Sequence, residues 1–185
     1  MNKVLFCIVG RTASGKDTLT SQLCKDMNMK QLISYTTRLP RYDGENTHIF
    51  VTLDDYTKDV VDGNIIAQTV INDYVYWATE QQVYDNDFYI IDPKGIEELK
   101  NRNLNLHIVT IYITAEEEVR RRRFLMRQPG HQELFTQRNN SENEQFEHFE
   151  QNKMFDYIIY NNRFEDSLKQ LSDIVYTERK NNNEI

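Results

Sequence analysis

A glycine-rich segment near the start of the chain has the residue types and spacing of a phosphate-binding loop. It reads Gly10-Arg11-Thr12-Ala13-Ser14-Gly15-Lys16. Glycines let backbone N–H groups converge on phosphate oxygens, and the helix expected after the loop adds partial positive charge at its N-terminus. Lys16 can reach the terminal phosphates as a point charge. The segment therefore predicts binding of a nucleoside triphosphate by these seven residues, with Lys16 also acting in catalysis.

The residues after this lysine, together with a later aspartate, are candidates for holding Mg²⁺. Such loops usually continue with Ser or Thr, whose hydroxyl helps to hold the ion, whereas this chain continues with Asp17 and Thr18. A carboxylate can coordinate the ion directly or through water, or the Thr18 hydroxyl can take that place, and both alternatives stay open. We expect both residues to contact the triphosphate as well. Asp92 ends an apolar run, and a strand-terminal acid near a phosphate loop indicates a third metal candidate.

A second cluster can bind another phosphate. It lies in the stretch Ser34-Tyr35-Thr36-Thr37-Arg38-Leu39-Pro40-Arg41. Two arginines three residues apart on a loop, with hydroxyl side chains before them, can grip a dianionic phosphate through charged hydrogen bonds. The chain thus has a site for a triphosphate and a separate one for a phosphorylated acceptor.

Arginines also gather further along the chain, at positions 120–123, at Arg127 and, beyond a Pro-Gly break, at Arg138. Charge on a transferring phosphoryl group needs cations that arrive as the site closes. Arg123 and Arg127 are four residues apart and share one helix face. Arg123, Arg127 and Arg138 are therefore candidates for such mobile cations.

The first arginines of that run favour a different interpretation. Successive helix residues point in different directions, so the four cannot all face the phosphates. For Arg120 and Arg121 we favour a solvated helix face paired with the acids at 116–118.

The spacing of apolar residues predicts the elements that position these groups. Continuous apolar runs indicate buried strands at 4–9, 88–92, 107–113 and 157–160, with a short strand at 32–34. Periodic stretches indicate helices at 17–27, 52–63, 79–84, 93–100, 115–127, 134–152 and 164–175. Alternating strands and helices favour an α/β fold, a parallel sheet with helices on both faces. A hairpin at 64–70 and 74–77 marks residues 35–80 as an insertion, and 177–185 look like a frayed tail.

The composition, 39% hydrophobic and 28% charged residues, is typical of a globular protein. A formal net charge of −7 argues against a nucleic-acid partner. The early apolar run is too short for a signal peptide or a membrane span, and Cys7 and Cys24 lie in apolar settings that favour reduced thiols. We expect a cytoplasmic protein that binds small nucleotides and neither nucleic acid nor membrane, with monomer and homodimer both open.

The chain resembles the guanylate kinase family. The resemblance rests on the phosphate loop, on the segment 34–41, on Gly44-Glu45 leading to His48-Ile49-Phe50-Val51, and on Phe155-Asp156-Tyr157-Ile158-Ile159-Tyr160-Asn161-Asn162. In this order the motifs cover nearly the whole chain. They imply a P-loop five-stranded parallel core at 1–33, 80–122 and 145–178, a β-containing insertion for a nucleoside monophosphate at 34–79, a helical lid at 123–144 and a tail at 179–185.

The resemblance also implies roles for individual residues. The acceptor-binding residues would be Ser34, Arg38, Arg41, Glu45, His48, Gln68, Tyr76, Ala78 and Asp92. The phosphate loop, Asp17 and Thr18 would bind ATP, and Asn161 would contact its adenine. Arg123, Arg127 and Arg138 would be the catalytic arginines of the lid. His48 stands where the family usually has a tyrosine. The family reads guanine with a glutamate and a hydroxyl. Here the first position is Gln68, or Ala67 with a one-residue offset, and the second is Ala78, or Thr79. Trp77 replaces a glycine, which we expect to crowd the pocket.

The implied reaction is ATP and (d)GMP to ADP and (d)GDP, with ATP and Mg²⁺ as cofactors. A (d)NMP kinase of another base specificity is one alternative. A ribose 1,5-bisphosphate phosphokinase is another, which the spacing Glu45-Asn46-Thr47-His48-Ile49 resembles, although the intact segment 36–38 and Arg41 favour a nucleotide. The third is a non-catalytic guanylate-kinase-like binding module. Such modules typically lack the loop lysine that this chain has as Lys16.

Overall fold

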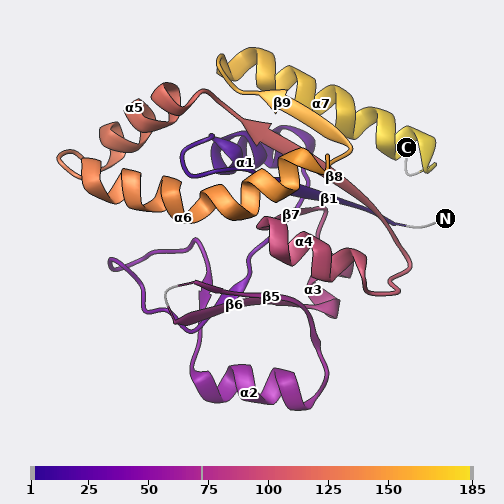
Figure 1. Cartoon of the computed structure of the whole chain (residues 1–185). Helices are drawn as coiled ribbons and strands as arrows, with labels where there is room; N and C mark the ends of the chain where they lie inside the picture. Colours follow the sequence, from indigo (N-terminus) through magenta and orange to yellow (C-terminus); the bar gives the residue numbers. More distant parts are fainter. Residues whose placement is uncertain (1–2, 72, 184–185) are drawn as a thin grey trace.

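The computed structural model describes residues 3–71 and 73–183. At its centre is an all-parallel five-stranded sheet in the order β2-β7-β1-β8-β9 (Figure 1). Its strands are β1 (Lys3–Val9), β2 (Gln31–Leu32), β7 (Phe88–Ile90), β8 (Leu106–Thr114) and β9 (Tyr157–Tyr160). The continuous apolar run of β1 follows from this position, because a central parallel strand is buried on both faces.

Helices cover both faces of the sheet, as predicted. On one face, Val4, Phe6 and Ile8 of β1 pack with α1 (Lys16–Met27) and α7 (Phe164–Asn181). On the other face, Leu5, Cys7 and Val9 belong to a second cluster with α4 (Pro93–Lys100) and α6 (Gln132–Gln151). Alternate residues of one strand therefore supply both halves of the core.

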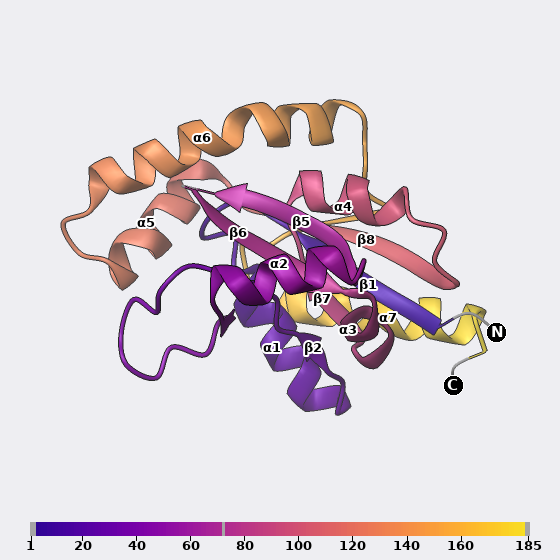
Figure 2. The ribbon, with the colours of Figure 1, turned by 90° about the horizontal axis from the view of Figure 1, so that it is seen from below.

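The predicted insertion forms a second sheet, in the order β4-β3-β6-β5. Its elements are β3 (Tyr35–Thr36), β4 (Ile49–Phe50), α2 (Leu53–Val61), β5 (Ile65–Ile71) and β6 (Tyr74–Thr79), followed by α3 (Glu80–Asp85). The predicted hairpin is confirmed as β5 and β6, and Thr52 caps α2 together with Asp55. Helix α2 lies on the side of this sheet away from the parallel core (Figure 1, Figure 2).

The predicted lid, residues 123–144, spans the end of α5 (Glu117–Arg127) and the first part of α6, which are joined around the predicted Pro-Gly break. The two helices pack through Phe124 and Phe135, which form a small cluster with Ala13 of the phosphate loop. Helix α6 runs without interruption from the lid to the core, where Phe146 and Phe149 are buried. Arg138, one of the predicted lid arginines, therefore lies on a helix that is also part of the core.

The predicted frayed tail is wrong for residues 177–181, because α7 continues to Asn181. Glu178 anchors this last part, since its carboxylate lies 3.0 Å from His107 Nε2 and accepts a hydrogen bond from the Tyr157 hydroxyl. Residues 184–185 of that tail lie outside the described residues. No helix in the described ranges is long and apolar enough to cross a membrane.

Candidate active site

A cavity of about 700 Å³ brings the two predicted phosphate-binding regions together. It lies between the carboxyl ends of the central strands, the insertion and α6. The phosphate loop and α1 contribute Gly10, Thr12, Lys16 and Asp17; the insertion contributes Ser34, Arg38, Arg41, His48 and Tyr76; α6 contributes Arg138 and Glu142. In parallel α/β sheets, ligands bind at this end of the strands.

The phosphate loop joins β1 to α1 in the geometry that its glycines require. Gly15 has φ of +90°, and a Cβ there would overlap the side-chain nitrogen of Asn161. A Cβ on Gly10 would lie 2.5 Å from the carbonyl oxygen of Ile113. Gly15, the residue before α1, has no side chain to cap the helix, so the N-terminus of α1 can bind an anionic ligand.

Two predicted nucleotide contacts lie behind this loop instead of in the cavity. Asn161 Nδ2 donates to the Ser14 carbonyl at 2.8 Å. Arg123 donates to the same carbonyl at 3.3 Å and to the Asn161 carbonyl at 2.8 Å. Neither side chain is among those that line the cavity. In this structure both stabilise the backbone of the loop.

Lys16 and Asp17 face the cavity side by side, with Lys16 Nζ 3.6 Å from Asp17 Oδ2. This ammonium lowers the pKa of the Asp17 carboxyl, whose side chain is 71% exposed. Thr18 is exposed and does not line the cavity.

Of the three metal candidates, Asp17 and Asp92 reach the cavity. Asp92 also caps α4, since its Oδ1 accepts from Gly95 N at 2.9 Å. Mg²⁺ is usually held by one or two carboxylates together with substrate phosphates and water. The ionised Asp17 carboxylate beside the phosphate loop fits this requirement.

On the acceptor side, a buried carboxylate holds the two predicted arginines. Glu45 accepts hydrogen bonds from Arg38 Nη2 at 2.8 Å, from Arg38 Nη1 at 3.2 Å and from the Arg41 backbone N–H at 2.6 Å. Its side chain is 1% exposed, and it lies behind the cavity wall, not in it. The Arg41 side chain is 54% exposed, so its guanidinium can reach a ligand. Glu45 was itself predicted to bind the acceptor. In the structure it holds Arg38 and the backbone of Arg41 in place instead.

His48 lies beside Ser34 and Tyr76 on the same wall. Its Nδ1 is 3.0 Å from Ser34 Oγ, and its ring lies edge-on to Tyr76, whose hydroxyl accepts from Arg38 Nε at 3.2 Å. Desolvation lowers the pKa of His48, and the nearby Arg38 adds to this effect. The ring is therefore neutral near pH 7 and can still donate one hydrogen bond to a phosphate.

Of the positions predicted to read the base, Gln68 reaches the cavity and Ala67 and Ala78 do not. Ala78 is fully buried and pairs with Ala67 across β5 and β6, and neither lines the cavity. Gln68 lines the cavity, but its Oε1 accepts from the Tyr56 hydroxyl at 2.9 Å.

The expectation that Trp77 crowds the pocket is wrong. Its ring packs on Tyr35 and Tyr56, its Nε1 donates to Asp59 of α2 at 2.9 Å, and it does not line the cavity. The strand pairing turns this side chain toward α2, because neighbouring strand residues point to opposite faces.

Among the predicted lid arginines, Arg138 is the one that lines the cavity, with its guanidinium 5.6 Å from the centre of the Phe124 ring. Arg127 is exposed outside it.

The solvated interpretation is wrong for Arg120, which is 5% exposed and donates to Asn139 Oδ1 at 3.0 Å. Arg121 does lie in solvent beside Glu118. Arg120 is buried because α6 packs over the face of α5 that carries it.

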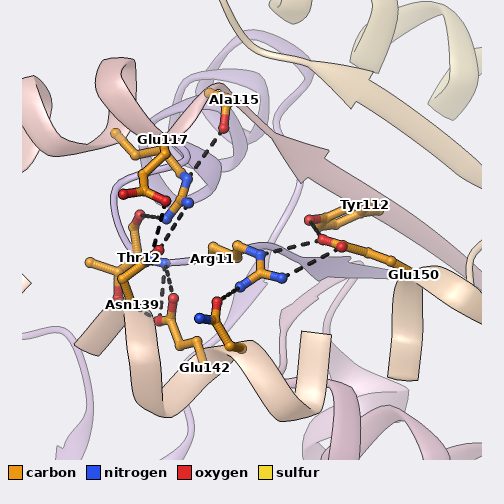
Figure 3. A network of polar contacts seen from close by, with 10 residues as sticks. Arg11, Thr12, Tyr112, Ala115, Glu117, Asn139, Glu142 and Glu150 are labelled. Atoms are coloured by element: carbon orange, nitrogen blue, oxygen red, sulfur yellow. Dashed lines mark hydrogen bonds and ion pairs between the residues drawn. The ribbon is translucent and has the colours of Figure 1, made fainter. Parts of the chain in front are cut away.

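The residues of α6 that contact the phosphate loop were not predicted from the sequence. Glu142 binds Thr12, and Asn143 and Glu150 bind Arg11, in the network of Figure 3. Arg11, predicted to bind ATP, points to this helix. The α6 segment is polar on most sides, so no apolar stripe marks the face that contacts the loop. The acids at 142 and 150 are the sequence feature of α6 that could have indicated this contact.

The comparisons with known proteins agree with this geometry. The guanylate kinase family profile matches residues 2–178. The guanylate kinase of Rickettsia bellii is 29% identical over 194 residues, covering 98% of each chain. That of Cupriavidus metallidurans is 27% identical over 187 residues, covering 95% of this chain and 83% of that protein.

A solved structure shows the same fold. The crystal structure of guanylate kinase from Anaplasma phagocytophilum matches with a TM-score of 0.71 at 23% identity, over 96% of this chain and 86% of that one. The predicted α/β class, a five-stranded parallel sheet with helices on both faces, is confirmed. The match of the profile to almost the entire sequence confirms the resemblance as well, and the chain belongs to the guanylate kinase family of phosphotransferases.

Proposed function

We propose that this protein transfers the terminal phosphate of ATP to the phosphate of a nucleoside monophosphate, with GMP or dGMP as the first acceptor. One observation carries the proposal. A single cavity has Lys16 and Asp17 on the phosphate-loop side and Ser34, Arg41 and His48 on the insertion side. Lys16 on one element and Ser34, Arg41 and His48 on another can each bind a phosphate, and Asp17 can hold Mg²⁺, which together are what a transfer between two phosphorylated molecules requires.

The chemistry needs no covalent intermediate and no protein base. An oxygen of the acceptor phosphate attacks the terminal phosphate of ATP in line, and the protein holds both in place. Lys16 and Arg138 supply positive charge around the transferring group, while Arg41 and the His48 ring hold the acceptor phosphate. When bound beside Asp17, Mg²⁺ would neutralise charge that develops on the phosphate oxygens.

The choice of GMP follows from the relatives, which are named guanylate kinases. The residues at the positions predicted to read the base favour a second candidate. It is a nucleoside monophosphate kinase with a different base preference. Ala67 and Ala78 are buried outside the cavity, and the Gln68 side chain, which reaches it, has one carbonyl oxygen that already accepts from the Tyr56 hydroxyl and an NH2 group that can only donate. A guanine ring left without partners for its N–H groups loses about 1–3 kcal/mol per unpaired group.

The deciding experiment measures ADP release from ATP and Mg²⁺ with each ribo- and deoxynucleoside monophosphate and with ribose 1,5-bisphosphate. The Lys16→Ala protein, purified in parallel, identifies activity from contaminating kinases. We expect GMP or dGMP to have the highest kcat/KM. If another nucleotide or the sugar bisphosphate is best, the guanylate assignment fails and the kinase assignment survives. If no acceptor gives activity that depends on Lys16, the kinase proposal itself is wrong, and a binding module is the remaining interpretation.

A further inference from the structure

A carboxylate of α6 is bound to the first half of the phosphate loop. The backbone N–H of Thr12 lies 3.0 Å from both side-chain oxygens of Glu142, and the Thr12 hydroxyl donates to one of them at 2.5 Å (Figure 3). The two residues are 130 positions apart in sequence. Three contacts between one anionic side chain and one residue define the position of that side chain closely.

Further bonds on either side of this pair hold the same helix. Arg11 donates to Asn143 Oδ1 at 2.9 Å and to Glu150 Oε1 at 3.3 Å, and its guanidinium lies 4.8 Å from the centre of the Phe146 ring. The hydroxyl of Tyr112, from β8, donates to Glu150. Successive turns of α6 are therefore fixed to the loop and the sheet.

The buried Arg120 of α5 closes the network at its other end. It donates to Asn139 of α6 at 3.0 Å and to the Thr12 carbonyl at 3.5 Å. Asn139 in turn donates to Glu117 at 3.3 Å. Residues 139, 142, 143, 146 and 150 recur at three- and four-residue steps, so they share one side of α6, and that side faces the phosphate loop.

The geometry points to Glu142 as a positioning residue for Arg138, an inference that rests on the proposed function. The two residues are four positions apart on α6, so they lie one above the other, and both line the cavity. Because Glu142 is bound to Thr12, α6 cannot rotate about its axis or shift along it near Arg138. The guanidinium is thereby held over the space between the phosphate loop and the acceptor arginines.

This contact does not compete with the nucleotide for the first turn of α1. Glu142 takes the N–H of Thr12, whereas the N–H groups of Lys16 and Asp17 lie at the uncapped N-terminus of α1. A phosphate bound there leaves the Thr12 contact in place. We therefore expect Glu142 to act on the transfer step through Arg138, not as a group that ATP displaces.

A double-mutant cycle tests the link between the two residues. We expect Glu142→Ala to lower kcat about 10- to 100-fold, the size expected from a misplacement of about 1 Å, with less than a threefold change in the Kd of ATP. Glu142→Gln keeps an oxygen for the donors of Thr12 and should recover most of kcat. The Glu142→Ala/Arg138→Ala double variant should be no slower than Arg138→Ala alone. Losses that multiply, or a Glu142→Ala protein that binds ATP more tightly, would overturn the inference.

A second readout does not depend on activity. In the nucleotide-free protein, Glu142→Ala should speed backbone hydrogen exchange across the lid half of α6, residues 132–143, because its anchor is lost. Glu144→Ala is the matched control, since Glu144 is an exposed acid of the same helix, and should leave exchange and kcat unchanged. Equal exchange in the Glu142→Ala and wild-type proteins would refute the anchor. A wild-type protein that phosphorylates no acceptor would refute the proposed function, and hydrogen exchange would still decide the anchor.

Discussion

The Glu45 carboxylate lies 2.8 Å from Nη2 of Arg38, and its side chain is 1% exposed. It also accepts from the Arg41 backbone N–H and, at 2.7 Å, from the Thr47 hydroxyl. One buried acid therefore closes the loop between β3 and β4 and presents both arginines to the cavity. A buried charge is tolerated when it is paired and hydrogen-bonded in this way.

Glu45→Ala should destabilise the protein and weaken acceptor binding. Removing one partner of a buried ion pair leaves the other uncompensated and costs about 3 kcal/mol. We expect this loss in the free energy of urea unfolding and a rise of the acceptor KM of at least tenfold. Asp43→Ala, an exposed acid of the same loop, is the control and should change neither. Equal effects of the two substitutions would contradict the role of Glu45.

The same ion pair predicts how stability depends on pH. The hydrogen bonds from Arg38 lower the pKa of Glu45 from an ordinary 4.5 to about 2. Because the folded-state pKa is the lower one, the folded protein favours the charged form, and the stabilisation is fully present above about pH 4.5. It is lost as pH falls from 4.5 through 2. The difference in unfolding free energy between wild type and Glu45→Gln, measured from pH 6 to pH 2, should shrink across this interval. A difference that stays constant would show that Glu45 does not titrate there.

Features determined by neighbouring residues could be predicted from the sequence. The apolar run of β1, the glycine loop and the start of α1 follow one another within about 20 positions, and each shows its own local pattern. The hairpin of β5 and β6 was predicted for the same reason. The cluster of Ser34, Arg38 and Arg41 was found because its three members lie within eight residues.

Contacts between distant segments could not be predicted in this way. Glu142 meets Thr12 only because α6 crosses the phosphate loop, and no periodicity of α6 indicates that crossing. Trp77 turns toward α2 because of the strand pairing. Charge patterning alone made Arg120 look solvated, whereas the packing of α6 on α5 buries it with Asn139 as its partner.

This difference between Arg120 and its neighbour can be measured. Arg120→Leu leaves the Asn139 side-chain oxygen and the Ala115 carbonyl without their donor, and an unsatisfied buried group costs about 1–3 kcal/mol. We expect the free energy of unfolding to fall by about 2 kcal/mol. Arg121→Leu, on the exposed face, should change it by less than about 0.5 kcal/mol. A loss that is equal for both would restore the solvated interpretation of Arg120.

Gly15→Ala should abolish ATP binding through the shape of the loop. Its φ of +90° disfavours a side chain, and the new methyl group would overlap Asn161, which holds the Ser14 carbonyl. Gly44→Ala is the matched control, because its φ is +79° and no heavy atom lies within 4 Å of the added Cβ. It should lose about 1–2 kcal/mol of stability from backbone strain and bind ATP as tightly as wild type. Calorimetric titration with ATP, beside urea unfolding, separates the two effects. Weakened ATP binding in the Gly44→Ala protein would show that backbone strain alone explains the result at Gly15.

Lys16→Ala should remove catalysis and leave the fold intact. The Lys16 side chain contacts Asp17 and faces the cavity, so its removal leaves the core unchanged. Loss of one preorganised charge at a transferring group lowers kcat by roughly 10²–10³-fold. Steady-state ADP release and a thermal unfolding curve would be measured together with those of Lys25→Ala, an exposed lysine of the same helix. We expect both variants to unfold at the wild-type temperature and only the first to lose turnover. A Lys16→Ala protein with undiminished activity would show that the reaction takes place elsewhere, because no transfer at this loop can proceed at full rate without the cation that faces its phosphates.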